Sequence, residues 1–399
     1  MSNSNDTLPT LVVGGGIGGL ATALAMAHAG RDVHLIEQAP EFTEIGAGLQ
    51  VGPNATRMLD RLKILDQVLE LAVIPARGVM LDAVTGDQLT VLDLGPSFRE
   101  RYGYPYMVVH RSDLLTILLQ ACREHPSITL ENDKAVAEVW SEGDRAGVKC
   151  LDGSLYESEL LLGADGLNSR VRTLIDDSAP RNSGYVAYRG TLPMSDMKSE
   201  VSDNDVVLWV GPGMHLIQYP IRRHELYNQV AVIRSDRFHR GENVYGTPDE
   251  LVDRFSIACA DVQRSIARIS TDRSWPILDR DPLHTWVHGR AALLGDAAHP
   301  MLQYLGQGAC QALEDAHTLA QEVTANRDDL PAALASYQDR RIQRTTRCQL
   351  SARPWGDVWH TGDPAMLALR NRVLRSRSPN DYSELDWLYL DPDLEPGLS

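Results

Sequence analysis

The sequence lacks the features that mark secreted and membrane-spanning chains. Its five cysteines are scattered, odd in number and include no C-x-x-C pair, so we expect free thiols in a reducing cytoplasm. No stretch approaches the roughly 18 consecutive apolar residues of a membrane-spanning helix. The first ten residues are polar, without the basic start and apolar run of a signal peptide. We therefore expect a cytoplasmic location and no membrane span.

Positive charge is also scarce. The chain has 38 Lys and Arg residues against 54 Asp and Glu residues, a net charge of −16, which argues against nucleic acid and anionic membrane surfaces as partners. A small anion would also be repelled at long range, so a site for one must be built from local cations. Metal-binding motifs are missing too: His284 and His288 stand four apart without an H-E-x-x-H motif or a third ligand, and we predict no metal site.

The most informative segment that is present is a glycine-rich turn at residues 14–19, with the sequence GGGIGG. It follows an apolar, β-branched run at residues 10–13 and precedes a predicted helix at 17–29, rich in Ala and Leu. A second buried strand is predicted at 33–36. A G-x-G-x-x-G motif in this strand–turn–helix–strand context predicts a dinucleotide-binding site.

Each glycine of the motif has a physical role in such a site. Gly14 permits the tight turn, Gly16 lets the backbone approach a pyrophosphate, and Gly19 lets the helix pack closely on the strand. Glu37, about 20 residues further on, suits a ribose 2′-hydroxyl and would repel a 2′-phosphate. This motif alone does not distinguish NAD from FAD.

The remaining periodicity predicts an α/β fold whose dinucleotide-binding part is interrupted. Helical spacing is found at residues 55–70, Ser112 is expected to cap the helix that follows it, and further helices are predicted at 307–324 and 331–348. The segment from 183 to 280 alternates as short strands and turns, which predicts a mostly antiparallel sheet. The predicted division is a dinucleotide-binding domain at 1–182 and 281–325, a sheet-based domain at 183–280, and a helical region at 326–399.

Four further motifs occur in a fixed order over about 300 residues. They are HRSDL at 110–114, GADGLNSRVR at 163–172, LLGDAAHP at 293–300 and GQG at 306–308, the last followed by Asp315. Together with the glycine turn they resemble the motifs of the class A flavoprotein aromatic hydroxylases, the para-hydroxybenzoate hydroxylase family. The resemblance implies a Rossmann-like FAD-binding domain of the glutathione-reductase type, an inserted, mostly antiparallel substrate-binding domain, and C-terminal helices.

The resemblance also implies which residues bind FAD. Asp296 is expected to accept a hydrogen bond from a ribityl or ribose hydroxyl, and Arg111 is expected near the flavin. The complete set of expected cofactor-binding residues is Gly14, Gly16, Gly19, Glu37, Gln38, Ala47, Arg111, Asp165, Asp296, Gly306 and Gly308.

The rest of the chain resembles the 3-hydroxybenzoate 6-hydroxylase branch of this family. The segments concerned are residues 184–190, 215–220, 303–305 and 355–360. Many family members have proline where this chain has Gln303. The resemblance implies an FAD-dependent monooxygenase that uses NADH or NADPH and O₂, and that transfers a hydroxyl group from a flavin C4a-hydroperoxide to a small aromatic acid. It also favours a homodimer.

Site roles follow from the chemistry of a phenol, whose ortho and para carbons become nucleophilic when it loses its proton. His215 is the expected general base, because imidazole titrates near neutral pH. Gln303 is expected to hold the hydroxyl, and Tyr106 and Tyr219 to contact the ring or carboxylate. In 3-hydroxybenzoate the para carbon is C6, so the expected product is gentisate (2,5-dihydroxybenzoate).

Three alternatives remain open. The chain could act as a decarboxylating hydroxylase on salicylate or 6-hydroxynicotinate, which would release CO₂. It could be an FAD-binding oxidoreductase without oxygen transfer, which would consume NADH without hydroxylating a ring. A flavin-binding regulator without activity would show no substrate-stimulated reduction of the flavin.

Overall fold

The glycine motif lies at the end of the central strand of a parallel sheet. The structure is a computed structural model that describes residues 7–43, 47–196 and 203–391. Neighbouring strands of this sheet run parallel, except that the edge strand, at residues 287–288, is antiparallel to its neighbour, at residues 291–293. In spatial order the strands are β17 (Val287–His288), β18 (Ala291–Leu293), β11 (Leu161–Gly163), β1 (Leu11–Val13), β2 (Val33–Ile36) and β7 (Ile128–Glu131).

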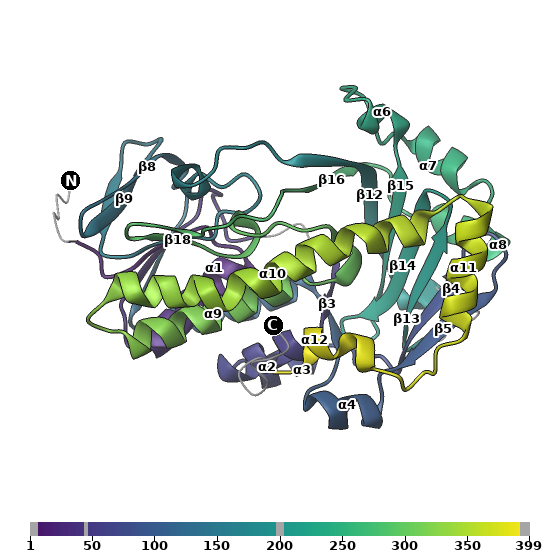
Figure 1. Cartoon of the computed structure of the whole chain (residues 1–399), viewed down its shortest axis with the longest axis horizontal. Coiled ribbons are helices and arrows are strands. Elements are labelled where there is room, and N and C mark those ends of the chain that lie inside the picture. Colours follow the sequence, from purple (N-terminus) through teal and green to yellow (C-terminus); the bar gives the residue numbers. More distant parts are fainter. Residues whose placement is uncertain (1–6, 44–46, 197–202, 392–399) are drawn as a thin grey trace.

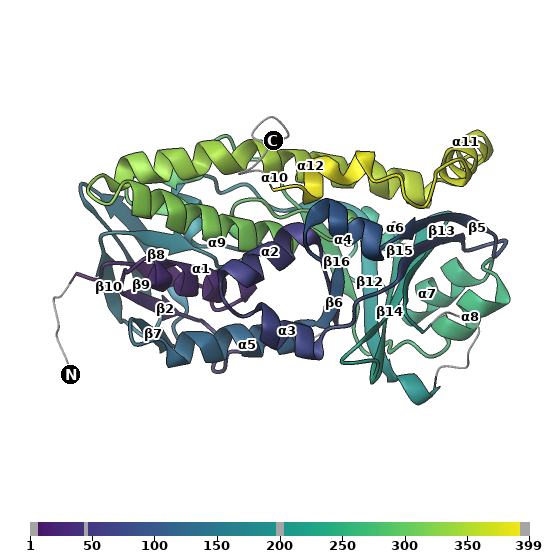
Figure 2. The same ribbon diagram turned by 90° about the horizontal axis from the view of Figure 1, so that it is seen from below.

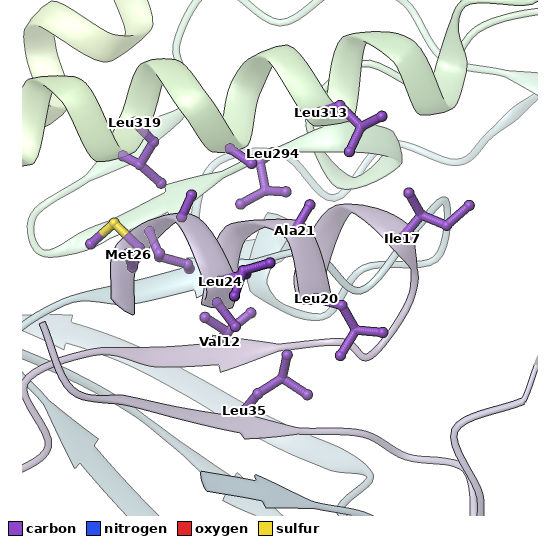
Figure 3. Packing of buried hydrophobic residues seen from close by; sticks show 14 of the residues in the cluster. Val12, Ile17, Leu20, Ala21, Leu24, Met26, Leu35, Leu294, Leu313 and Leu319 are labelled. Atoms are coloured by element: carbon purple, nitrogen blue, oxygen red, sulfur yellow. The ribbon is translucent and has the colours of Figure 1, made fainter. Parts of the chain in front are cut away.

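The helix after the glycine motif, α1 (Ile17–His28), is buried on nearly all sides. Its apolar side chains meet Val12 and Leu35 of the sheet on one face and Leu313 and Leu319 of α9 (Gly308–Ala325) on the other (Figure 3). Because both faces are covered, the Ala- and Leu-rich sequence of α1 has no polar face. The strand–turn–helix–strand unit predicted from the sequence is confirmed to within one residue at each boundary.

A second sheet, of seven strands, lies beside the part of the chain that contains the six-stranded sheet (Figures 1 and 2). It is mostly antiparallel, as expected, and only its β13–β4 pair is parallel. Its spatial order is β16 (Trp275–Asp279), β12 (Arg181–Pro193), β15 (Leu226–Arg234), β14 (Met214–Ile221), β13 (Asp205–Gly211), β4 (Arg77–Asp82) and β5 (Gln88–Asp93).

Strands β4 and β5 differ from the predicted division of the chain. The prediction assigned residues 1–182 to the dinucleotide-binding domain, whereas these two strands extend the second sheet. The guanidinium of Arg77 on β4 donates two hydrogen bonds, of 3.1 and 2.6 Å, to the carboxylate of Asp205, its partner residue on β13. The division into domains otherwise stays a prediction.

The other elements surround these two sheets. Helices α7 and α8 cover the face of the seven-stranded sheet that is remote from α10 (Figure 2). No helix in the described ranges combines the length and apolar character needed to cross a bilayer. The remaining strands are β3 (Gly48–Val51) paired with β6 (Met107–His110), and a small sheet of β8 (Val136–Glu142), β9 (Arg145–Cys150) and β10 (Leu155–Ser158). The remaining helices are α2 (Pro53–Arg61), α3 (Leu65–Leu71), α4 (Pro96–Tyr102), α5 (Arg111–Glu124), α6 (Asp236–His239), α7 (Pro248–Phe255), α8 (Ala260–Ile266), α10 (Leu330–His360), α11 (Pro364–Arg375) and α12 (Asp386–Tyr389), with short 3-10 turns η1 (Val171–Leu174), η2 (Met194–Asp196), η3 (Gly295–Ala297), η4 (Gln303–Leu305) and η5 (Ser383–Leu385).

The helical spacing predicted at residues 55–70 is confirmed by two short helices, α2 and α3. The N-cap predicted at Ser112 was wrong. Helix α5 begins at Arg111, so Ser112 is not its N-cap; the Ser112 hydroxyl instead lies 2.7 Å from Nδ1 of His110.

Helix α10 is much longer than the predicted 331–348. It continues through Pro354 to His360 and crosses from the parallel sheet to the seven-stranded sheet (Figure 1). Residues 348, 352, 356 and 360 are all buried, a four-residue spacing that keeps one face of the helix packed past the proline. Gly356 is required there because a Cβ atom would lie 2.4 Å from Cε2 of Tyr304.

A buried charge network joins α10 to α9. The guanidinium of Arg341 contacts Glu314 at 2.5 Å and Asp315 at 2.7 Å, and Arg344 contacts Glu314 at 2.7 Å. All four side chains are at most 3% exposed. Burial raises the pKa of Glu314, but the charges of Arg344 and Arg341 outweigh it and hold that pKa well below its usual value. Asp315 also accepts hydrogen bonds from the Gly295 amide at 2.9 Å and from His299 Nε2 at 2.6 Å.

Replacing Arg341 by methionine should therefore destabilise the fold strongly. Glu314 and Asp315 would keep their charge in a buried site with one cation fewer, a loss of about 3–5 kcal/mol. The matched control is Arg340→Met, which removes a half-exposed arginine paired with Glu322 at 2.6 Å and should cost less than about 1 kcal/mol. Equilibrium urea unfolding of both variants measures the difference. Equal losses in the two variants would contradict a central role for the network.

Candidate active site

One cavity runs from the glycine motif to the seven-stranded sheet. Its volume is about 1070 Å³, beyond the roughly 300–1,000 Å³ typical of sites for drug-sized ligands, which leaves room for a dinucleotide and a small aromatic molecule. Every residue predicted to bind cofactor or substrate borders this cavity except Gly19. The fold thus brings together residues that are up to 294 positions apart in the sequence, Gly14 and Gly308.

The glycines of the first motif hold three segments closer than side chains would allow. Gly14 has a positive φ of 109°, and a Cβ atom on it would lie 2.4 Å from the carbonyl oxygen of Ala164. A Cβ atom on Gly19 would lie 1.9 Å from the carbonyl oxygen of Gly14, so only glycine at position 19 lets the helix approach the turn this closely. Gly16 borders the cavity, and a Cβ atom there would meet nothing within 4 Å. The turn at Gly16 is therefore open to a ligand at the N-terminus of α1.

The carboxylate of Glu37 lies at the same end of the cavity but has two backbone partners. It accepts hydrogen bonds from the amides of Gly15 at 2.6 Å and Ala39 at 2.9 Å. A carboxylate has lone pairs for further bonds, so a ribose hydroxyl could still be held. Gln38 and Lys134 border the cavity beside it.

Ala47 and Arg111 line the cavity where β3 and β6 pair. The Arg111 amide donates a 3.1 Å hydrogen bond to the Ala47 carbonyl, which brings the two residues together at the start of α5. The sequence predicted both as cofactor contacts, and the structure places both side by side on the cavity wall.

The Asp165 side chain mainly organises its own loop. Its carboxylate accepts hydrogen bonds from the Ser169 hydroxyl and from the amides of Arg170 and Val171. Asp165 borders the cavity, but these partners give its carboxylate a structural task that the sequence did not indicate. Asn168 and Arg170, from the same loop, also line the cavity.

Asp296, in contrast, is exposed to the cavity and forms no hydrogen bond with any described residue. Its Oδ1 lies 3.7 Å from the position that a Cβ atom on Gly308 would take. Gly306, in the adjacent turn, has a positive φ of 63°. An unengaged carboxylate at Asp296 and an open glycine turn at Gly16 border the same cavity and suit the ribityl and pyrophosphate groups of FAD, so the residues present fit the cofactor.

His215 stands at the opposite end, on β14. The side chain is 2% exposed, and its Nδ1 lies 2.7 Å from Nε2 of His360, the last residue of α10. Burial lowers the pKa of His215 to about 3, so its imidazole is neutral at ordinary pH. A neutral imidazole has one unprotonated ring nitrogen, which a general base needs.

Gln303 lies on η4 and is oriented by an arginine. Nη2 of Arg189 donates a 3.3 Å hydrogen bond to Oε1 of Gln303. With its oxygen engaged in this way, the Gln303 amide nitrogen is the group left to donate to a ligand. Arg189 also borders the cavity, and it is the cation of β12 at the end where His215 lies.

The two predicted substrate tyrosines both border the cavity and belong to one apolar cluster. The Tyr106 hydroxyl donates a short hydrogen bond to Oε1 of Gln50, which engages this hydroxyl. Tyr219 follows His215 by four residues on β14 and borders the same cavity, and burial raises its pKa. The Tyr219 ring packs directly against the backbone of Gly48, because a Cβ atom on Gly48 would lie 2.4 Å from Cε2 of Tyr219.

Sequence reasoning missed four residues of this end: Gln50, Arg189, Tyr304 and His360. Arg189 and His360 stand inside segments singled out for their resemblance, so their presence was visible although their contacts were not. Gln50 had no motif around it. In the described ranges no three His, Cys, Asp or Glu side chains come together as a metal site.

Comparison with known proteins agrees with this geometry. The FAD binding domain family matches residues 7–349. The 3-hydroxybenzoate 6-hydroxylase of Polaromonas naphthalenivorans is 38% identical over 392 residues, covering 98% of this chain and 97% of that protein. The 3-hydroxybenzoate 6-hydroxylase of Klebsiella oxytoca is 36% identical, covering 95% and 96% of the two chains.

A solved structure has the same fold. The crystal structure of Klebsiella pneumoniae HpxO with FAD and uric acid superposes with a TM-score of 0.80 at 27% identity, covering 93% of each chain. The family match over most of the length and the nearly complete coverage of both relatives agree with the motifs found in the sequence. The chain therefore belongs to the FAD binding domain family and, within it, to the flavoprotein aromatic hydroxylases.

Proposed function

We propose that the protein is an FAD-dependent monooxygenase that converts 3-hydroxybenzoate to gentisate. The observation that carries the proposal is the single cavity that joins the glycine motif and Asp296 to His215 and Gln303. Both named relatives are 3-hydroxybenzoate 6-hydroxylases by name. NADH or NADPH as electron donor, a homodimer and a cytoplasmic location stay part of this proposal.

FAD, when bound, supplies the reduced ring that activates O₂ for transfer to the substrate. The residues that would hold it are the turn at Gly14 and Gly16, Glu37, Arg111 and Asp296. The protein's own task at the other end is to ionise and orient the substrate. Exclusion of water from the cavity protects the oxygen-transfer step, since water would divert it to H₂O₂.

His215 takes the phenolic proton in this scheme. Its Nδ1 is engaged by His360, so Nε2 is the atom that receives the proton. The Gln303 amide nitrogen then donates a hydrogen bond to the phenolate oxygen. Because both groups address the same oxygen, they hold the hydroxyl end of the ring and present the carbon opposite to it for attack.

The substrate carboxylate is accommodated by local positive charge. The chain as a whole carries −16, yet cations from several elements border the cavity. Arg189 lies at the substrate end of the cavity. Burial raises the pKa of Tyr219, and the positive charge of Arg189 opposes this effect in part. We infer that Arg189 provides the electrostatic compensation that the bulk charge cannot.

The first test is cofactor retention. The purified protein should be yellow with one non-covalent FAD per chain, and Asp296→Ala should weaken FAD binding about 10- to 100-fold through loss of a charge-assisted hydrogen bond. Asp328→Ala, in the exposed turn after α9, is the matched control and should retain FAD fully. Fluorescence titration of the apoprotein measures both. A colourless protein that ignores added FAD would refute the assignment.

The second test concerns His215. His215→Ala should keep FAD and remain reducible by NADH, while hydroxylation falls by about 10²–10⁴, the usual contribution of a general base. Consumed O₂ should then appear as H₂O₂. The exposed His284→Ala serves as control and should behave as the unaltered protein. If His215→Ala hydroxylates as much substrate per NADH consumed as the unaltered protein does, His215 is a structural residue and not the base.

The third test is the position of attack. With the hydroxyl held by His215 and Gln303, 3-hydroxybenzoate should yield gentisate without CO₂, identified by chromatography against standards. Protocatechuate or 2,3-dihydroxybenzoate as the main product would contradict this binding mode and leave the hydroxylase assignment intact. Conversion of salicylate to catechol with CO₂ release, and no activity on 3-hydroxybenzoate, would move the protein to the decarboxylating branch.

A further inference from the structure

The proposed base is half of a buried pair of histidines. His215 comes from β14 and His360 from the C-terminal end of α10, and their ring centroids are 5.0 Å apart with planes inclined by 17°. The 2.7 Å contact joins Nδ1 of His215 to Nε2 of His360. No described residue bonds Nε2 of His215, which is therefore the nitrogen available to a ligand in the cavity.

The environment of His360 fixes its ring. Tyr185 of β12 stacks on it at 4.4 Å and 24°, and Tyr304 of η4 meets it edge-on at 5.4 Å. His360 is 6% exposed, and its Nδ1 has no hydrogen-bond partner among the described residues. Its backbone carbonyl accepts a 2.9 Å hydrogen bond from the Gly213 amide, which ties the end of α10 to the turn before β14.

The charged and titratable groups around the pair come from five elements. Arg370 of α11 donates a 3.1 Å hydrogen bond to the carbonyl of Trp359 and is itself paired with Asp82 of β4 at 3.1 Å. Asp357 lies one turn back on α10, and Tyr185 and Tyr304 complete the set. Burial, then the proximity of His215 and Arg370, lowers the pKa of His360 well below its usual value. Both imidazoles are therefore neutral at ordinary pH.

Two neutral imidazoles can share only one proton across such a contact. If it lies on Nδ1 of His215, then Nε2 of His215 carries a lone pair toward the cavity and can accept a phenolic proton. If it lies on Nε2 of His360, then Nε2 of His215 carries a hydrogen and cannot act as base. A phenol hydroxyl selects the first arrangement, in which His360 is the acceptor.

We propose, on the basis of the function proposed above, that His360 is a positioning residue that holds His215 in the Nδ1–H tautomer required of the base. When the phenol O–H bond breaks, the proton forms a new bond to Nε2 of His215, and the electron pair stays on oxygen as the phenolate. The resulting imidazolium donates from Nδ1 to the lone pair of His360. His360 is the last residue of α10, where the helix dipole favours positive charge.

The test measures ionisation of the bound substrate, which does not depend on turnover. Oxidised holoenzyme is titrated with 3-hydroxybenzoate across pH, and the phenolate difference absorbance gives the apparent pKa of the bound phenol. His360→Phe keeps a ring but removes the acceptor, so this pKa should rise by about one unit, a tenfold change in ionisation. His360→Leu provides the same loss in a smaller side chain should Phe not be accommodated.

Two further variants separate positioning from packing. His360→Gln offers an amide oxygen as acceptor and should restore part of the shift. Tyr185→Phe leaves the stacked ring and removes only a hydroxyl, so its titration should match the unaltered holoenzyme. In turnover, His360→Phe should lower kcat about 10- to 100-fold at neutral pH with KM nearly unchanged, and recover as the pH rises and the phenol ionises unaided.

The outcomes are distinct. A His360→Phe or His360→Leu holoenzyme whose phenol titration is unshifted, or whose kcat falls equally at every pH together with a raised KM, overturns the proposal and leaves His360 as packing. Unaltered holoenzyme that neither ionises nor hydroxylates 3-hydroxybenzoate refutes the proposed function itself, and with it this role of His360.

Discussion

The carboxylate of Asp315 is the point on which the architecture depends. It accepts hydrogen bonds from the amide of Gly295, the ring of His299 and the guanidinium of Arg341; the first two belong to the turn at η3 and the third to α10. These bonds position the turn that carries Asp296 and attach α10 to α9. Because Asp315 is fully buried, its charge persists only while these partners surround it. The turn that carries Asp296 and the helix α10 are thus both held by the carboxylate of Asp315.

The sequence predicted the elements whose signals are local. Residues 10–36 alternate from β-branched strand to glycine turn to Ala-rich helix, and the structure follows them within one residue. Strands β12, β13, β14 and β15 of the second sheet were also found, because turn residues separate them in the sequence. Strands β4 and β5 were not assigned to that sheet, since β4 pairs with β13, which lies 128 residues further along the chain at Arg77 and Asp205, and no local pattern encodes such a pairing. Helix α10 passes Pro354 because its buried face continues on both sides of the proline.

The site divides in the same way. The glycine turn, Asp296, His215 and Gln303 could be named because each stands in a recognisable motif, and all border one cavity. Their roles stay predictions. What the sequence could not indicate is how the side chains are oriented: Arg189 engages the oxygen of Gln303, Gln50 engages Tyr106, and His360 approaches His215 from 145 residues away. Such orientation arises from packing between elements that are distant in the chain.

Helix α10 adds a constraint on chain length. Its two anchored positions, Arg341 and His360, are 19 residues apart on one uninterrupted helix, a separation of about 28 Å at 1.5 Å per residue. Insertion or deletion of one residue between them would turn His360 by about 100° away from β14 while Arg341 stayed in place. The length of this interval is therefore fixed by its two ends. The count of residues between two anchors is thus as much a part of the site as the side chains themselves.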